Sequence, residues 1–262
     1  MLRAFSTAAT GMTAQQMMVD VTANNLANIN TTGFKRSQIN FQDLIYVKVR
    51  DAGAEVASGI IVPSGLEIGS GVRVASTVKV FSNGELENTS RKLDIAITGD
   101  GFLQVTMPNG DTRYTRDGAL QMNANGELVT TTGYILEPAI SIPSDAVSVD
   151  IGKDGTVSVT NAAGTTSSVG TIQLARFPNP SGLSSEGDNL LAETEASGTL
   201  TTGTAGENGF GTIQSGFLEK SNVQMVTELV NLITAQRAYE TSSRAIRAGD
   251  EMLRGAIQIV GS

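Results

Sequence analysis

The sequence predicts an α+β protein in which two long terminal helices pair as a coiled-coil-like domain and all-β domains are inserted between them. Two observations predict this class. Apolar residues recur every seven positions at both ends of the chain, which is typical of helices that pack along a seam. Between the ends, apolar and polar residues alternate and turn pairs such as Asn-Gly separate them, which is typical of strands and hairpins.

The first predicted element is an amphipathic helix over residues 1–30. Its main apolar column consists of Phe5, Met12, Val19 and Leu26. Between Ala4 and Phe34 the only charged side chain is Asp20, whereas a solvated helix face normally carries many charges. Ser, Thr, Gln and Asn occupy the other faces instead.

This uncharged surface has two interpretations. The helix is either partly exposed along a polar face, or it is surrounded by partners. In the second case Asn24, Asn25 and Asn28 form hydrogen bonds across interfaces, because a neutral amide is cheaper to bury than a charge.

The middle of the chain, residues 35–215, is predicted to be all-β. Asn-Gly, Asp-Gly and Ala-Gly pairs punctuate it, among them those that begin at 83, 109, 117, 125, 154 and 163. Strands are expected at 93–98, 102–107, 133–137, 147–151, 156–160 and 171–177, and loops at 179–212. The segment 123–127 and the residues Asp100, Asp111 and Asp117 lack the spacing of a metal site, so we interpret them as turns.

The last predicted element is a helix over 221–260, with Ser221 or Asn222 as its N-cap. Its apolar column is Met225, Leu232, Tyr239, Ile246, Leu253 and Val260. A charged stripe from Arg237 to Glu251 is either a solvated face or the lining of a water-filled channel. Because neither terminal seam is strong alone, we expect the two helices to pack on each other and on copies from neighbouring subunits.

These elements predict three domains. The first is a helical coiled-coil domain of residues 1–32 and 222–262. The second is a connecting β-rich domain of 33–92 and 206–221, and the third an outer β domain of 93–205.

Composition limits the functions that this chain can have. The chain of 262 residues has no Cys, His or Trp and a formal net charge of −8. Thiolate and imidazole chemistry are therefore excluded, whereas catalysis by carboxylates or lysine stays open. The acidic charge argues against nucleic-acid binding. We also expect no membrane insertion and no cleaved signal peptide, since Ser, Thr and Gln interrupt the first 16 residues.

Four separated blocks resemble the rod and hook proteins of the bacterial flagellar basal body. They are ANNLANINTTGFKR (23–36), GDGFLQV (99–105), YTRDGALQMNANGELVTTTGYILEPAI (114–140) and ELVNLITAQRAYETSSRAI (228–246). The order is that of the family, and the resemblance covers nearly the whole chain. Gly249-Asp250-Glu251 departs from the family pattern by its glycine, and we expect Gly249 to loosen the last helix.

Within this family, the length and the segments 63–74 and 137–143 resemble a subunit of the distal rod segment. Residues 46–63 match the position of a stretch that the resemblance assigns to that subunit and not to the hook. We expect this stretch to form a hairpin that stiffens the rod. Ile45, Val47 and Val49 alternate with Tyr46, Lys48 and Arg50 as a strand, residues 51–59 form the bend, and Ile60, Ile61 and Val62, followed by Pro63, return.

The resemblance implies a structural subunit without enzymatic activity, cofactor or metal. It assembles head-to-tail into a hollow helical drive shaft across the periplasm. Implied partners are copies of the chain, proximal rod and hook-side axial proteins, the surrounding P- and L-ring bushing and the flagellar type III export apparatus. Alternatives are a proximal rod subunit or, from another class, a β-rich secreted carboxylate hydrolase. The residues expected to make the assembly interface are Phe5, Met12, Val19, Asn24, Asn25, Leu26, Asn28, Leu232, Tyr239, Ile246 and Leu253.

Overall fold

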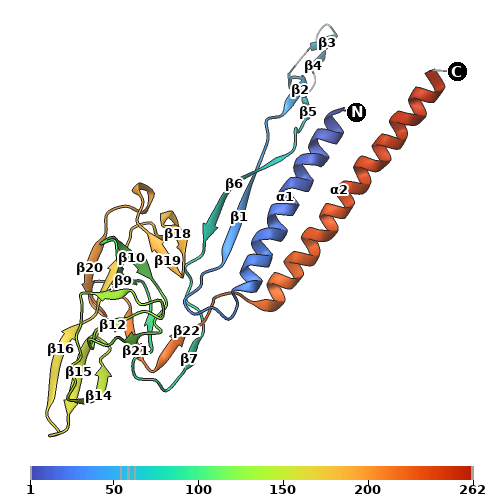
Figure 1. Cartoon of the computed structure of the whole chain (residues 1–262). Helices are drawn as coiled ribbons and strands as arrows, with labels where there is room; N and C mark the ends of the chain where they lie inside the picture. Colours follow the sequence, from blue (N-terminus) through green and yellow to red (C-terminus); the bar gives the residue numbers. More distant parts are fainter. Residues whose placement is uncertain (1, 54, 58–59, 62, 261–262) are drawn as a thin grey trace. The chain divides into compact units, whose positions relative to one another are not determined.

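The computed structural model describes residues 2–53, 55–57, 60–61 and 63–260, and they form two compact units (Figure 1). The helical unit comprises Met1–Leu26, Ser37–Val78 and Met225–Ser262. The β unit comprises Ala27–Arg36 and Lys79–Gln224. This confirms the predicted α+β class, with a helix at each end and a β-rich middle.

Both predicted helices are present, although each is shorter than expected. Helix α1 spans Leu2–Ala27 and helix α2 spans Met225–Val260. Helix α1 ends before Asn28, whose backbone carbonyl and side chain both accept hydrogen bonds from Thr31 and form a turn. Neither described helix contains an apolar stretch long enough to cross a membrane.

The N-cap predicted for α2 was wrong. The helix begins at Met225, three residues after Asn222, and the amide of Asn222 bonds to other segments of the β unit. The Ser221 hydroxyl accepts a hydrogen bond from the Val223 backbone, which forms a local turn. Long-range partners therefore hold the Asn222 side chain and a local turn holds that of Ser221, so neither caps the helix.

The helical unit also contains a ribbon of paired strands. Strand β1 (Ser37–Asp43) pairs with β6 (Val72–Lys79), β2 (Val47–Arg50) with β5 (Leu66–Ile68), and β3 (Glu55–Ala57) with β4 (Ile60–Ile61). The predicted hairpin therefore exists, but its expected pairing was wrong. Val47 lies opposite Ile68, and Ile60 and Ile61 pair with β3. Val62 lies outside the described residues.

The β unit is built around one large sheet in the order β11-β12-β13-β9-β10-β19-β18, with β17 and β20 joined to it through β9. Its strands are β9 (Phe102–Thr106), β10 (Thr112–Thr115), β11 (Gln121–Met122), β12 (Leu128–Val129), β13 (Ile135–Glu137), β17 (Gln173–Arg176), β18 (Ser184–Gly187), β19 (Leu190–Ala192) and β20 (Thr201–Thr204). A three-stranded sheet consists of β14 (Ala146–Ile151), β15 (Thr156–Asn161) and β16 (Thr166–Thr171). Two pairs join β21 (Thr212–Ser215) to β8 (Ile95–Thr98) and β22 (Phe217–Glu219) to β7 (Leu86–Asn88).

All six strands expected from alternation are found, and each of their ends lies within two residues of the expected position. The expected loop at 179–212 was wrong, because it contains β18, β19, β20 and two short 3-10 helices, Pro180–Gly182 and Glu195–Ser197. Leu183, Leu190 and Leu191 from this segment are buried in the cores of the β unit. Strand β19 pairs with β10 and strand β20 with β17, both far away in sequence, so local composition did not predict them.

Candidate assembly surface

The first turns of α2 carry a stripe of large apolar side chains that the described part of the chain leaves in water. Its members are Met225, Val226, Leu229, Val230 and Ile233, with exposed fractions between 40% and 76%. At 100° per residue they occupy an arc of about 140° on the helix. Residues of this type are normally buried, and a contiguous exposed apolar patch indicates an interaction surface. We call these five residues the α2 stripe.

The predicted packing residues occupy intermediate positions between core and solvent. On α1, Phe5, Met12, Val19 and Leu26 are half-buried. On α2, Leu232, Ile246 and Leu253 are half-buried and Tyr239 is 41% exposed. Contacts within the chain thus cover only part of each apolar column.

The two helices meet through small residues. A β-carbon on Gly249 would lie 2.7 Å from Cε1 of Phe5, so the aromatic ring packs directly against the glycine backbone. A β-carbon on Gly11 would lie 3.7 Å from the hydroxyl of Ser242. Gly249, which departs from the family pattern, is therefore the place where α2 accommodates Phe5.

An apolar cavity of about 110 Å³ lies beside this contact. It is lined by Ala4, Phe5, Ala8, Ala245, Ile246, Gly249 and Met252. Met252 is 62% exposed at its rim. The single-chain packing of the helix pair is therefore incomplete at the level of Phe5.

On its other side, α1 contacts the ribbon of β1 and β6 (Figure 1). The Gly71 backbone passes so close to Thr10 that a side chain at Gly71 would collide with the threonine hydroxyl. At the other end of the helix, Nδ2 of Asn25 donates to the Ser37 carbonyl over 2.9 Å, and its Oδ1 accepts from the Ser37 backbone N–H over 2.8 Å.

These bonds place Asn25 differently from the other predicted amides. Asn25 is only 2% exposed, and both ends of its amide are used within the chain, so it is not available to bond a neighbouring subunit. Asn24 is exposed and Asn28 is half-buried. Asn25 is therefore the buried one of the three amides, and the sequence pattern did not distinguish it.

The hairpin stretch is amphipathic. Val47 and Val49 alternate with Lys48 and Arg50, and Val47 lies opposite Ile68. Val49, Leu66 and Ile68 are 58%, 51% and 45% exposed, while Lys48 forms ion pairs with Asp51 and Glu67 on the charged side. Tyr46, half exposed, lies over Gly69, and Pro63 is exposed. The stretch therefore offers an uncovered apolar face like that of the α2 stripe.

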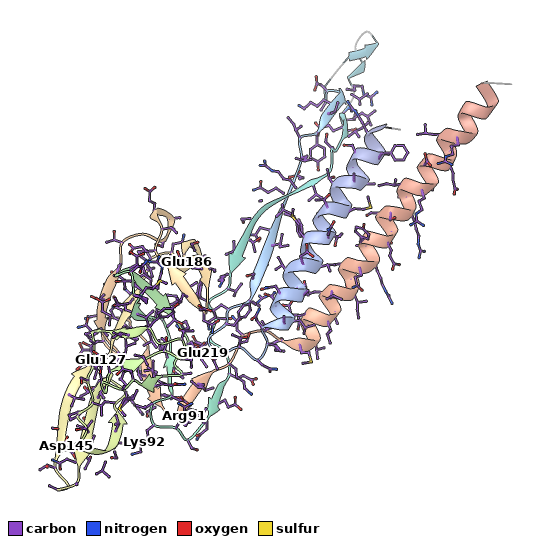
Figure 2. The ribbon with its side chains drawn as sticks, viewed as in Figure 1. Arg91, Lys92, Glu127, Asp145, Glu186 and Glu219 are labelled. Carbon is purple, nitrogen blue, oxygen red and sulfur yellow. The ribbon has the colours of Figure 1, made fainter. Side chains whose placement is uncertain are left out.

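The sequence analysis did not find a buried ionic cluster in the β unit. Glu219, which is labelled in Figure 2, lies at the end of β22. It accepts hydrogen bonds from Lys35 and Arg116, and the three side chains are at most 4% exposed. Arg116 also donates to the carbonyls of Gly99, Gly101 and Ile97 and to Asn83. Each charged group of the cluster is thus hydrogen-bonded, as a buried charge requires.

The cluster shifts the pKa values of its members. Burial lowers the pKa of Lys35, and the attraction of Glu219 offsets this only in part. Burial alone raises the pKa of Glu219, but the charges of Arg116 and Lys35 outweigh it and hold that pKa below its ordinary value. Glu219 is therefore ionised at neutral pH, and its charge contributes to stability above its ordinary pKa of 4.5.

Lys35 and Arg116 lie in two of the blocks that carry the family resemblance. The first block is attached to the β unit at several points. The Gly33 N–H donates to the carbonyl of Glu219, and the Thr32 hydroxyl donates to Asp117. A β-carbon on Gly33 would lie 2.6 Å from the Arg116 backbone, so only glycine fits at this positive-φ position. The two charged residues that end the otherwise neutral first block, Lys35 and Arg36, were the available signal for this cluster.

The segments considered as possible metal sites are turns. Asn123 accepts hydrogen bonds from the backbone of Asn125 and Glu127 and donates to the Glu127 carboxylate. Asp111 is part of the β9–β10 turn, where Asn109 bonds it. Asp117 bonds Thr32 and the Ala119 backbone. Their oxygens therefore stabilise local structure.

Comparisons with known proteins agree with the resemblance. Residues 5–35 match the family described as flagella basal body rod protein. Residues 96–159 match the flagellar hook protein FlgE/F/G D1 domain, and residues 214–259 match the flagellar basal body rod FlgEFG protein C-terminal family.

Relatives align over nearly the whole chain. The flagellar basal-body rod protein FlgG of Buchnera aphidicola subsp. Schizaphis graminum is 46% identical over 251 residues, which is 95% of this chain and 96% of the relative. The protein of the same name from Caulobacter vibrioides is 44% identical, covering 98% and 99% of the two chains. The one from Bacillus subtilis is 37% identical, covering 99% of each.

Proposed function

The chain belongs to the family of flagellar basal-body rod proteins, and we propose that it is a subunit of the distal rod that polymerises into a hollow helical drive shaft. It is a structural component of the basal body. In the proposed shaft, head-to-tail copies transmit motor torque to the hook across the periplasm.

One observation carries this proposal, namely the uncovered apolar surface of the helical unit. The α2 stripe and the apolar face of the hairpin lie on different elements of one unit. A contact that uses two different patches is heterologous, and heterologous contacts that do not close into a ring generate open helical assemblies. Burying such side chains against another copy stabilises the assembly by about 25 cal/mol per Å² of apolar surface.

We propose that particular residues make these contacts. The inner packing residues are Phe5, Met12, Val19, Leu26, Leu232, Tyr239, Ile246 and Leu253, and Asn24 and Asn28 add hydrogen bonds across the interface. The stiffening contact is made by Tyr46, Val47, Val49, Ile60, Ile61, Val62 and Pro63. We also propose the three-domain division predicted from the sequence, in addition to the two compact units described above.

The further partners follow from the place of a distal rod subunit. They are proximal rod and hook-side axial proteins at the two ends of the shaft, the P- and L-ring bushing around it, and the type III export apparatus, which delivers the chain without a cleaved signal. We expect neither enzymatic activity nor a bound cofactor. The hydrolase alternative does not explain why the chain is similar to rod proteins over nearly its full length.

Electron microscopy of the purified, concentrated chain tests the proposal. The expected result is straight hollow tubes of uniform diameter. A chain that stays monomeric at high concentration, or forms only irregular aggregates, contradicts it. Tubes of a few turns that stop growing favour the proximal rod alternative.

Deleting residues 46–63 tests the stiffening contact separately. The expected result is tubes that form but curve or flex, because the apolar face of the hairpin no longer packs on a neighbour. Straight, stiff tubes from this variant contradict the role of the stretch and leave the polymerisation proposal intact.

A further inference from the structure

Three short segments of the β unit carry every chain connection to the helical unit. Residues 27–36 connect α1 to β1, the segment beginning at Lys79 continues from β6, and residues 220–224 lead into α2. Connections between compact units are usually exposed, flexible linkers with few contacts. Here the three segments bond to one another within the β unit.

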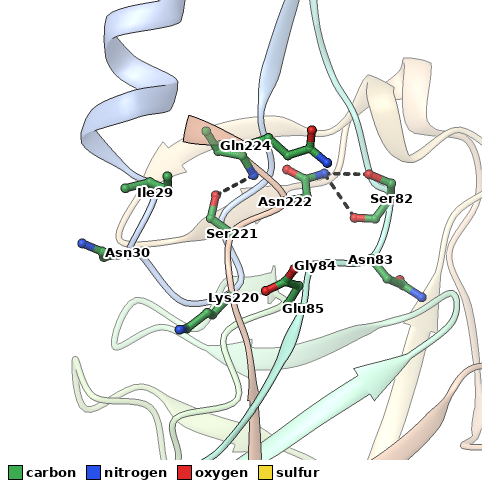
Figure 3. Close-up of a pocket in the computed structure, with 11 residues that line it drawn as sticks. Ile29, Asn30, Ser82, Asn83, Gly84, Glu85, Lys220, Ser221, Asn222 and Gln224 are labelled. Atoms are coloured by element: carbon green, nitrogen blue, oxygen red, sulfur yellow. Dashed lines mark hydrogen bonds between the residues drawn. The ribbon is translucent and has the colours of Figure 1, made fainter. Parts of the chain in front are cut away.

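The side chain of Asn222 reaches all three segments. Its Oδ1 accepts from the Arg36 backbone N–H over 2.8 Å. Its Nδ2 lies 2.8 Å from the Val80 carbonyl, 3.2 Å from the Ser82 carbonyl and 2.9 Å from the Ser82 hydroxyl (Figure 3). The Val80 N–H in turn donates to the Arg36 carbonyl over 3.0 Å. A single amide thus joins segments that lie 140 to 186 residues apart in sequence.

The buried ionic cluster reinforces the same arrangement. Nζ of Lys35 donates to the Ser82 carbonyl over 2.8 Å as well as to Glu219, and the Gly84 N–H donates to the Glu219 carboxylate over 2.9 Å. The Lys220 N–H donates to the Glu85 carbonyl over 2.8 Å. The Gly84 backbone crosses the Lys220 carbonyl so closely that a side chain there would collide with it.

The cluster and Asn222 differ in their surroundings. Lys35, Arg116 and Glu219 are buried, whereas Asn222 is half-buried and lines a polar cavity of about 410 Å³ together with Asn30, Asn83, Gln224 and other residues (Figure 3). Removing a buried charge therefore perturbs the core, whereas truncating Asn222 removes bonds between segments next to a space that water can fill.

We propose that Asn222 is a positioning residue that locks the three connecting segments together, so that a twist applied to the helical ends is passed to the β unit without a hinge. This inference rests on the proposed function, because it assigns the mechanical coupling of the subunit to one side chain. The Asn222 amide sets the stiffness of the assembled shaft. Its contribution to the stability of the subunit is no larger than that of a hydrogen-bonded asparagine elsewhere in the β unit.

The test compares two full-length variants, Asn222→Ala and Asn161→Ala. Asn161 is the matched control, because it caps the β15–β16 turn with hydrogen bonds to Ala163 and Thr165 and contacts none of the connecting segments. Three quantities are measured: the melting temperature of the monomer, the hydrogen-exchange rate of the Arg36 amide by NMR, and the persistence length of the tubes by electron microscopy.

The expected result is a similar small fall in melting temperature for both variants. Only Asn222→Ala increases the Arg36 exchange rate, by about tenfold, because its amide loses its acceptor. Only Asn222→Ala tubes have a persistence length below that of Asn161→Ala and unsubstituted tubes.

Equal persistence lengths for the two variants overturn the inference, and so does an unchanged Arg36 exchange rate. If Asn222→Ala does not fold, Ser82→Ala removes only the hydroxyl acceptor, and its tubes must bend more than those of Asn161→Ala for the inference to stand. If the unsubstituted chain forms no tubes, the proposed function fails, and the exchange rate of Arg36 alone decides whether Asn222 locks the segments.

Discussion

The β unit buries its large apolar side chains within one chain, whereas the helical unit leaves most of its own exposed. Among the residues that the structure describes, only three buried apolar residues belong to the helical unit: Ala14, Ile39 and Ala235. All the others lie in the β unit. Conversely, of the 17 large apolar residues that are exposed in the described part of the chain, 14 lie in the helical unit. The β unit is therefore complete as a monomer, and the helical unit has the surface of a protein that still lacks its partners.

Charge divides between the units in the same way. The helical unit holds 8 of the 18 basic and 9 of the 26 acidic residues, a net charge of −1, while the β unit carries −7. A nearly neutral surface lets many copies pack closely without repulsion, whereas a strongly acidic one stays hydrated and resists association. The comparison teaches that assembly and solubility are assigned to different units of one chain.

The largest effect is expected in the β unit, from Glu219→Gln. The substitution leaves Lys35 and Arg116 buried beside a neutral amide, and removing one partner of a buried ion pair costs about 3–5 kcal/mol. Urea denaturation of the monomer measures this as a lower free energy of unfolding.

Asp150→Asn is the control for that experiment. Asp150 pairs with Lys92 over 2.7 Å, but the side chains are 62% and 55% exposed. Its loss is expected to change the free energy of unfolding by no more than about 1 kcal/mol. Equal changes in the free energy of unfolding for the two substitutions would show that the buried cluster contributes no more stability than an exposed ion pair.

The next effect concerns assembly and comes from Val230→Ser in the α2 stripe. Val230 is 56% exposed, so the free energy of unfolding of the monomer should change by less than about 0.5 kcal/mol. In the tube, loss of a buried valine costs about 1.5–3 kcal/mol, which raises the critical concentration roughly 10- to 100-fold. Sedimentation of polymer against total protein measures it.

Val147→Ser in the β unit is the matched control, since Val147 is 72% exposed but lies outside the helical unit. It should change neither quantity. Should both variants polymerise like the unsubstituted chain, the α2 stripe is not part of the subunit contact.

A smaller effect separates two glycines of α2. Replacing a helical glycine by alanine stabilises the helix by about 0.5–1 kcal/mol. At Gly255 nothing lies within 4 Å of the new β-carbon, so Gly255→Ala should gain this full amount. At Gly249 the β-carbon would displace the Phe5 ring, so Gly249→Ala should gain nothing. Thermal unfolding followed by circular dichroism at 222 nm compares the two, and an equal gain would show that Phe5 does not pack there.

The sequence predicted those features that depend on local periodicity. Seven-residue columns over about 30 residues give the helices, and alternation gives strands such as β9 and β15, because side-chain direction repeats with the backbone. It could not predict which segments pair. The Asn83-Gly84 and Asp117-Gly118 pairs look like hairpin turns, but in the structure each glycine lets two distant backbones cross.

The candidate site shows the same limit. The apolar columns marked the surfaces of both helices, but Asn25, Asn24 and Asn28 were indistinguishable until Ser37 was placed beside Asn25. The ionic cluster joins residues up to 184 positions apart, and no spacing rule relates them. Pairing of Val47 with Ile68 was missed because several apolar segments follow the bend and apolarity alone does not set strand register.

The smallest effect concerns Tyr114, a buried residue in the second core of the β unit, where its ring packs edge-on against Phe177 at 4.8 Å. Burial, and then the charge of Glu193, raise the pKa of Tyr114 to about 12 from an ordinary value of 10. A raised pKa favours the protonated form in the folded state, so the contribution is present below pH 10 and is lost as the pH rises through about 12. Tyr114→Phe should therefore change stability at neutral pH by less than about 0.5 kcal/mol, since its hydrogen bond to Glu193 is long at 3.5 Å. When the absorbance of tyrosine phenolates at 295 nm is followed with rising pH, the Tyr114→Phe variant should lack the ionisation step that occurs at the highest pH. If the titration step lost in Tyr114→Phe lies near pH 10 instead, the Tyr114 phenol is accessible to water. This result would contradict the claim that the β unit buries its core within one chain.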